Sequence, residues 1–368
     1  MLSERALAEK IIHTCLQIQP GEEVQISTFH HTIPLAEALY TSCYQAGGVP
    51  YLLLETDRLF VATHSEVPIE NLLRTPQWQL CATERTNAII YLAGPEDAGI
   101  FALANPAAQR ALTEAYRPIY DMTFACKVRQ VSLLGSMCTP ARAHQYGVDY
   151  QAWRASFDAA MAADYAEIAA VGHALSGVIR GSASLHLTAA NGTDLTIKYA
   201  GTPIRVDDGI IDQEDLANGL FVTEFPTGKV QFALDPLSAT GIVVAPRVHL
   251  WGQVIENMRW EFANGRLIAW EADRNGEIFA EFFKEPMGYK DVCSQLIIGI
   301  NPGASLVNFN LNDLLVSGMV TVGIGDNLDV GGTIHTNSYF DATVPAATLD
   351  ADGVLLVENG QLLLPTHA

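Results

Sequence analysis

Basic residues are scarce in this sequence: 21 Lys and Arg stand against 41 Asp and Glu, which gives a formal net charge of −20 at pH 7. Because contacts to phosphate groups need Lys and Arg, this balance argues against nucleic-acid binding and against docking on an anionic membrane. Cysteine pairs of the CxxC type are also absent, which argues against a zinc cluster and favours reduced thiols over a disulfide framework. The six cysteines are scattered along the chain, at Cys15, Cys43, Cys81, Cys126, Cys138 and Cys293.

The sequence also lacks signals for export or membrane insertion. Residues 1–17, MLSERALAEKIIHTCLQ, predict an amphipathic helix with acidic residues, whereas a signal peptide has a basic start and a long apolar core. No apolar run is long enough to span a membrane. We therefore expect a cytoplasmic protein. The local catalytic signatures HExxH, GxSxG and GxxxxGKS/T are missing as well, and the spacing of Ser, His and Asp picks out no triad.

Apolar residues, in contrast, are plentiful. They make up 49% of the 368 residues, which is enough for a large core and allows two domains. Helical spacing at residues 3–18 and 33–45 alternates with strand patterns at residues 24–27, 49–55 and 88–93. Such alternation predicts a mainly parallel sheet flanked by helices. We assign this α/β domain to residues 1–175.

After about Gly181 the pattern changes to short alternating strands. Asn-Gly pairs, which favour tight hairpins, occur at Asn191-Gly192, Asn264-Gly265 and Asn359-Gly360. A single long helix is predicted for residues 149–173, ahead of this change. The predicted fold class is therefore α/β, with an amino-terminal α/β domain and, at residues 176–368, a carboxy-terminal β-rich, mostly antiparallel domain.

The stretch of residues 321–344, TVGIGDNLDVGGTIHTNSYFDATV, places polar residues between two predicted strands. The first strand ends near Ile324, and a turn, a Gly-Gly pair and the polar run His335-Thr336-Asn337-Ser338 follow it. The second strand, residues 339–344, contains Asp341. A segment of this kind can line a cleft, or it can be a plain β-connection whose polar residues satisfy one another.

Several short motifs occur in a fixed order along the second half of the chain. They are Phe225-Pro226-Thr227-Gly228-Lys229-Val230, Gly299-Ile300-Asn301-Pro302-Gly303, Gly325-Asp326-Asn327, Gly331-Gly332 and Asp341. By these motifs the chain resembles the aminopeptidase T-like metallopeptidases and the related 2,5-dihydroxypyridine 5,6-dioxygenases. The resemblance implies an amino-terminal α/β domain, a carboxy-terminal β-rich domain, a cleft and a homodimer.

The same resemblance implies metal ligands at positions that hold other residues here. A metal-binding Glu of the peptidases falls at Lys229, and a second Glu, which is His in the dioxygenases, falls at Gln295. A peptidase His falls at Thr321, a Tyr falls at Leu328, and the final His-x-Asp motif is Tyr339-Phe340-Asp341. Only the Asp remains. Zinc, cobalt and iron sites need several carboxylate or imidazole donors, and a Lys ammonium repels a cation, so we expect no metal cofactor.

Loss of an ion would leave an acid without its counter-charge. We expect Lys229 to lie beside Asp341 and to replace the charge of the ion, because an unpaired buried acid is costly. His335 is an added donor close to Asp341 in sequence. A rewired mononuclear site that combines His335 with Asp326 or Asp341 is therefore the alternative.

These residues lead to three functional hypotheses. The favoured one is a catalytically degenerate, metal-free protein that binds a peptide or peptide-like ligand, as an accessory protein in peptide natural-product biosynthesis. Its predicted ligand-binding residues are Lys229, Gln295, Thr321, Tyr339, Asp341 and His335. One alternative is a metal-dependent aminopeptidase or a ring-cleaving dioxygenase with rewired ligands. The other is a metal-free enzyme that uses Tyr339, Lys229 and Asp341 as acid–base groups.

Overall fold

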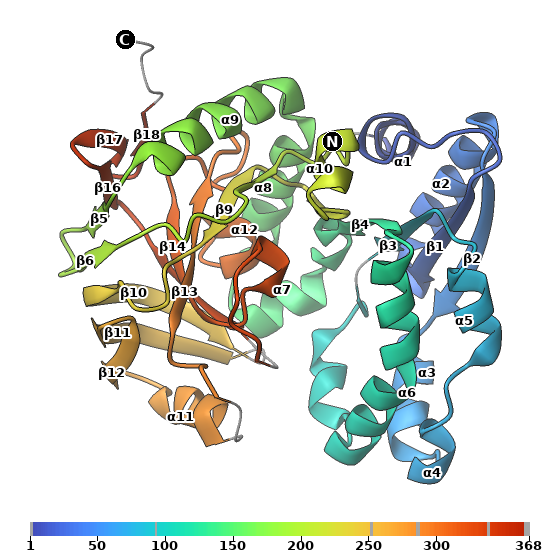
Figure 1. The fold of residues 1–368 in the computed structure, drawn as a ribbon. Coiled ribbons are helices and arrows are strands. Elements are labelled where there is room, and N and C mark those ends of the chain that lie inside the picture. The colour runs from blue at the N-terminus through green and yellow to red at the C-terminus, as the bar shows by residue number, and fades with distance from the viewer. Residues whose placement is uncertain (1–2, 93, 251–252, 285–287, 337–338, 364–368) are drawn as a thin grey trace. The chain divides into compact units, whose positions relative to one another are not determined.

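The computed structural model of the chain describes residues 3–92, 94–250, 253–284, 288–336 and 339–363. The chain forms two compact units, Met1–Tyr150 with Gly209–Pro226 and Gln151–Asp208 with Thr227–Ala368. Figure 1 labels their elements. Asn337 and Ser338, predicted as part of a polar run, lie outside the described residues. No helix in the described ranges is both long and apolar enough to cross a lipid bilayer.

The first unit is built on a five-stranded sheet in the order β2-β1-β3-β4-β8, in which all neighbouring strands are parallel. Its strands are β1 Glu23–Phe29, β2 Val49–Glu55, β3 Ala88–Leu92, β4 Arg129–Leu133 and β8 Val222–Phe225. Its helices are α1 Glu4–Lys10, α2 Ile33–Gln45, α3 Asp57–Ser65, α4 Ile69–Leu72, α5 Gln77–Thr83, α6 Pro106–Ala125, α7 Pro140–Tyr146 and α10 Gln213–Ala217. The predicted parallel α/β architecture is confirmed.

The second unit contains two sheets whose neighbouring strands are antiparallel. The eight-stranded sheet has the order β12-β11-β10-β6-β5-β16-β17-β18, and the other, called here the third sheet, has the order β15-β14-β13-β9-β7. The strands of the eight-stranded sheet are β5 Leu185–Thr188, β6 Asp194–Ile197, β10 Thr240–Leu250, β11 Gln253–Ala263, β12 Arg266–Glu271, β16 Thr348–Ala351, β17 Val354–Glu358 and β18 Gln361–Leu362. Those of the third sheet are β7 Arg205–Asp207, β9 Lys229–Ala233, β13 Cys293–Gly299, β14 Val320–Gly325 and β15 Tyr339–Val344.

The three Asn-Gly pairs lie in hairpins, as predicted. They join β5 to β6, β11 to β12 and β17 to β18, and each of these pairs of strands is antiparallel. The residues predicted to form one helix before them form two, α8 Tyr150–Ala162 and α9 Tyr165–Gly181. The break has a local cause, because the Asp164 side chain accepts hydrogen bonds from the backbone N–H groups of Ala166 and Glu167 and so begins a new helix. The remaining helices of this unit are α11 Gly276–Lys284 and α12 Asn310–Asp313.

The third sheet packs one face into the core of the second unit. Phe340 of β15 lies against Trp260 of β11 and Phe279 of α11, with ring centroids 5.6 and 4.9 Å apart. At the other edge of the sheet, α9 approaches β7 closely at Gly172, where an added Cβ would lie 2.3 Å from Val206 Cγ1. The opposite face of this sheet carries the polar residues that the sequence singles out.

Candidate functional site: the polar face of the third sheet

Side chains alternate between polar and apolar along the strands of the third sheet. Successive residues of a strand point to opposite faces, so every second residue shares a face. Strand register then aligns one set across the sheet, which we call the polar face. Its members are Arg205, Asp207, Lys229, Gln231, Gln295, Ile297, Thr321, Gly323, Tyr339, Asp341 and Thr343. Five of the six predicted ligand-binding residues, all except His335, therefore belong to one face.

Gln295 joins two neighbours into a hydrogen-bonded row. Its Nε2 donates to Asp341 Oδ1 at 3.0 Å, and its Oε1 accepts from Gln231 Nε2 at 3.0 Å. The bond to Asp341 passes over β14 at Gly323, which the register places between the two residues. An added Cβ at Gly323 would lie 2.4 Å from Gln295 Cγ and 2.7 Å from Asp341 Oδ1. The glycine is what allows this contact.

Lys229 lies elsewhere on the same face. It is opposite Gly299, whereas Gln295 is opposite Ala233, four residues further along β9. At roughly 3.4 Å per residue this offset is about 14 Å, so the expected pairing of Lys229 with Asp341 is wrong. Lys229 Nζ instead lies 3.7 Å from Asp207 Oδ2 on the adjacent strand.

Asp207 is shared by two cations. Arg205 places an Nη2 atom 3.5 Å from the same Oδ2 atom. The Asp207 and Lys229 side chains are only 1% and 8% exposed, so neither charge can be balanced by water. Both distances exceed that of a direct hydrogen bond, and the attraction is mainly electrostatic.

The loop after β14 folds back toward these charges. Its short 3₁₀ helix, Leu328–Val330 (η5), carries Asp329, which is influenced by the charges of Arg205 and Lys229. Part of the Asp329 side chain is exposed, but the protein around its carboxyl group removes water from it, and this burial raises the pKa of Asp329. The nearby positive charges of Arg205 and Lys229 offset part of this increase in the pKa. The segment therefore brings a second acid, besides Asp207, to the Lys229 end of the polar face.

Two polar residues of this loop, Asp326 and Asn327, accept hydrogen bonds from its backbone N–H groups. Asn327 donates to Ser294 O and accepts from Ile334 N, and an added Cβ at Gly332 would collide with the Asn327 side chain. Asp326 Oδ2 accepts from Thr336 N at 2.7 Å and lies 3.4 Å from Nδ1 of the exposed His335. The interpretation of this stretch as a self-satisfied β-connection thus holds for Asp326 and Asn327.

The Gly-Ile-Asn-Pro-Gly motif has a similar structural role. The Asn301 side chain is fully buried, donates to the carbonyls of Ala160 and Thr227, and accepts from Gly303 N and Ala304 N. It ties α8 to the turn that precedes β9. The Asn301 side chain therefore positions the strand that carries Lys229 and is not part of the polar face itself.

Only the β15 end of the polar face offers predicted site residues to solvent. Lys229, Gln295 and Thr321 are buried, and Thr321 Oγ1 lies 3.0 Å from Thr343 Oγ1. Asp341 is half-buried, and Tyr339 and His335 are exposed. The sequence analysis did not single out four polar members of the face, Arg205, Asp207, Gln231 and Thr343. The alternation Arg-Val-Asp and Lys-Val-Gln, charged or polar at every second position, was the available signal.

Comparison with known proteins decides the family. The sequence profile of the thermophilic metalloprotease (M29) family matches residues 3–292. The chain belongs to this family. Among curated protein sequences, none matches.

Two solved structures share the fold of this M29 chain. Wild-type AmpT from Thermus thermophilus has 17% identity and a TM-score of 0.75, with 98% of each chain covered. A 2,5-dihydroxypyridine dioxygenase from Pseudomonas putida KT2440 has 13% identity and a TM-score of 0.62, with 99% of each chain covered. The resemblance inferred from the sequence motifs is confirmed.

The metal ion that an M29 metalloprotease implies does not fit the donors that the polar face and its neighbouring loop provide. The polar face offers a carboxylate at Asp341, amides at Gln231 and Gln295, and hydroxyls at Thr321 and Thr343. At its other end, Asp207 is already paired with two cations. In the described parts of the chain, no three His, Cys, Asp or Glu side chains are grouped so that they could hold a metal ion. His335 and Asp326 would supply two donors, one fewer than a stable site commonly uses.

Proposed function

We propose that this chain is a catalytically degenerate, metal-free M29 family member that binds a peptide or peptide-like ligand at the β15 end of its polar face. The observation that carries the proposal is Lys229, a buried cation paired with Asp207 at the position where the resemblance places a metal-binding Glu. The ammonium group of Lys229 repels a divalent cation at this position, so the polar face has no metal ion to act as a Lewis acid. We further propose that the protein works in the cytoplasm, as an accessory protein in peptide natural-product biosynthesis.

The exposed end of the face has the groups that a peptide terminus needs. Asp341 accepts a hydrogen bond from Gln295 through Oδ1, and we propose that its half-buried carboxylate binds the α-ammonium group of the peptide. Tyr339 is exposed and shares the polar face with Asp341, two residues away on β15, and the exposed His335 lies 3.4 Å from Asp326 in the preceding loop. Lys229, Gln295 and Thr321 support the site from within the sheet.

The proposal predicts metal-free peptide binding. Protein purified from metal-supplemented medium should contain far less than one transition-metal ion per chain by plasma emission spectroscopy. Peptides found in a blind screen should bind by calorimetry, and N-acetylation should weaken binding about tenfold, because the charge-assisted bond to Asp341 is lost. Asp341→Asn should have a similar effect, and Glu271→Gln, on the exposed surface of β12, should have none.

Two results would contradict this proposal. One is about one zinc, iron, cobalt or manganese ion per chain, which would favour the rewired metalloenzyme. The other is peptide binding that neither acetylation nor Asp341→Asn changes.

We also propose that the protein is a homodimer whose interface includes the β-rich half. Strand β12 lies at the end of the eight-stranded sheet, and Ile268 on it is 59% exposed. Edge strands with exposed apolar side chains tend to be covered.

Light scattering at micromolar concentration should give twice the chain mass of 39.8 kDa. Ile268→Glu should shift the mass toward the monomer, whereas Leu237→Glu, also at an exposed apolar side chain, should not. A monomer in the wild type would refute the proposal.

A further inference from the structure

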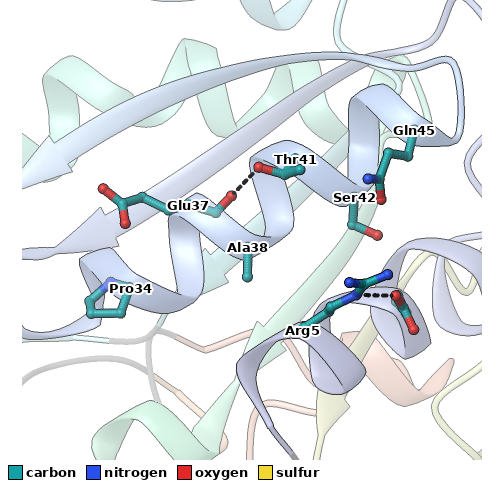
Figure 2. Close-up of a pocket in the computed structure, with 8 residues that line it drawn as sticks. Arg5, Pro34, Glu37, Ala38, Thr41, Ser42 and Gln45 are labelled. Atoms are coloured by element: carbon teal, nitrogen blue, oxygen red, sulfur yellow. Dashed lines mark hydrogen bonds and ion pairs between the residues drawn. The ribbon is translucent and has the colours of Figure 1, made fainter.

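The first unit has a surface pocket of about 350 Å³ between α1 and α2. Its lining includes Arg5 and Glu9 of α1 and Pro34, Glu37, Ala38 and Ser42 of α2 (Figure 2). All of these residues belong to one compact unit, and none belongs to the polar face of the third sheet. The pocket is therefore independent of the function proposed above.

Ser42 is the unusual residue of this pocket. It is only 4% exposed, yet its Oγ has no hydrogen-bond partner among the described residues. A helical Ser or Thr commonly donates to the carbonyl four residues earlier, as Thr41 does to Glu37 O at 2.9 Å. Figure 2 shows the Ser42 hydroxyl directed toward the side of the pocket where Arg5 lies. A buried hydroxyl without a partner is costly, and a ligand in the pocket would remove this cost.

The charges around the pocket favour a cation. Arg5 Nε donates to Glu9 Oε1 at 2.9 Å, so these two charges cancel, and Glu9 retains a second oxygen. Glu37 adds a carboxylate for which the described part of the chain provides no ion pair. The lining thus carries a net charge of about −1, on a chain whose formal charge is −20.

The floor of the pocket has room for an apolar stem. Pro34, Ala38 and Ser42 follow one another at intervals of four residues and so lie in line along one side of α2. We propose that this pocket binds a primary alkylammonium group. Its alkyl stem lies over Pro34 and Ala38, and its N–H groups donate to Ser42 Oγ and to the second carboxylate oxygen of Glu9.

Titration with n-pentylammonium, followed by two-dimensional NMR of the full chain, tests this inference. We expect saturable shifts confined to the backbone amides of α1 and α2. Ser42→Ala should weaken binding about tenfold, because it removes a buried acceptor, without lowering the melting temperature, because the hydroxyl makes no bond in the free protein. Glu37→Gln should weaken it about threefold, as for an exposed ion pair, and Glu4→Gln, outside the pocket on α1, should not.

Two further ligands test whether binding needs N–H groups and whether the amine can belong to a polypeptide. Tetramethylammonium has no N–H group to donate and should bind at least about tenfold more weakly than n-pentylammonium. Nα-acetyl-lysine methylamide mimics a lysine within a polypeptide. It should bind if the pocket accepts a lysine side chain, and it should fail to bind if the pocket accepts only small alkylamines without a peptide backbone. Absence of saturable n-pentylammonium binding at millimolar concentration would overturn the proposal, as would equal binding by Ser42→Ala or by tetramethylammonium.

Discussion

Exchanging Lys229 for Glu should destabilise the protein by about 3–5 kcal/mol, because it breaks a buried ion pair and places a second acid beside Asp207. Asp207 and Lys229 are almost completely buried, so water cannot screen the new repulsion. Arg205 remains close to Asp207 and still balances part of its charge, so the loss of stability could be as small as the lower end of this range. Chemical denaturation of wild type and Lys229→Glu at neutral pH measures the difference.

Two variants serve as controls for this result. Lys229→Met removes the cation without adding an acid and should cost less, because Arg205 still balances part of the Asp207 charge. Lys198→Glu makes the same charge change at an exposed position of the same unit and should stay within about 0.5 kcal/mol of wild type. If Lys229→Glu were as stable as Lys198→Glu, the buried pair would be absent.

Exchanging Gln295 for Glu should make the protein strongly pH-dependent. Gln295 is 2% exposed and donates to Asp341 at 3.0 Å, so the variant would hold two carboxyl groups in contact. Like charges at this distance cannot both ionise, so one pKa would rise well above the ordinary value of about 4.3 for Glu.

The sign of this pH effect follows from proton linkage. At a pH between the unfolded and the raised folded pKa, unfolding releases a proton, so stability falls as the pH rises. We therefore expect near wild-type stability at about pH 4 and a loss of about 2–4 kcal/mol at pH 7, since each unit of pKa shift is worth about 1.4 kcal/mol. Denaturant melts across this range measure the slope for wild type and variant.

A double variant separates the pair from either residue alone. Gln295→Glu combined with Asp341→Asn removes the second acid and should recover most of the stability at pH 7. Gln361→Glu, at an exposed position of β18, should show no added pH dependence. If the double variant were no more stable than Gln295→Glu, the contact across Gly323 would not exist.

Much of the fold was predictable because its signals are local. The bounds of α2 and of β2 and β15 agree with the sequence-based ranges, since periodicity and turn residues act within a few positions of one another. The Asn-Gly hairpins belong to the same class. Helix α6 was missed, because Pro118 inside it disfavours a helix locally. Packing overrides that preference, and Leu72 of α4 lies in one core cluster with Ala108 and Ala111 of α6.

The functional site followed a different rule. The sequence by itself determined which side chains alternate along β9, β13, β14 and β15, and therefore that Lys229, Gln295, Thr321 and Asp341 share a polar pattern. Only strand register decided their partners, because register sets which rows meet across a sheet. It placed Asp207, on β7, beside Lys229, and it placed Gly323 between Gln295 and Asp341. The charge on Lys229 was evident from the sequence, but the acid that holds it there came from the tertiary structure.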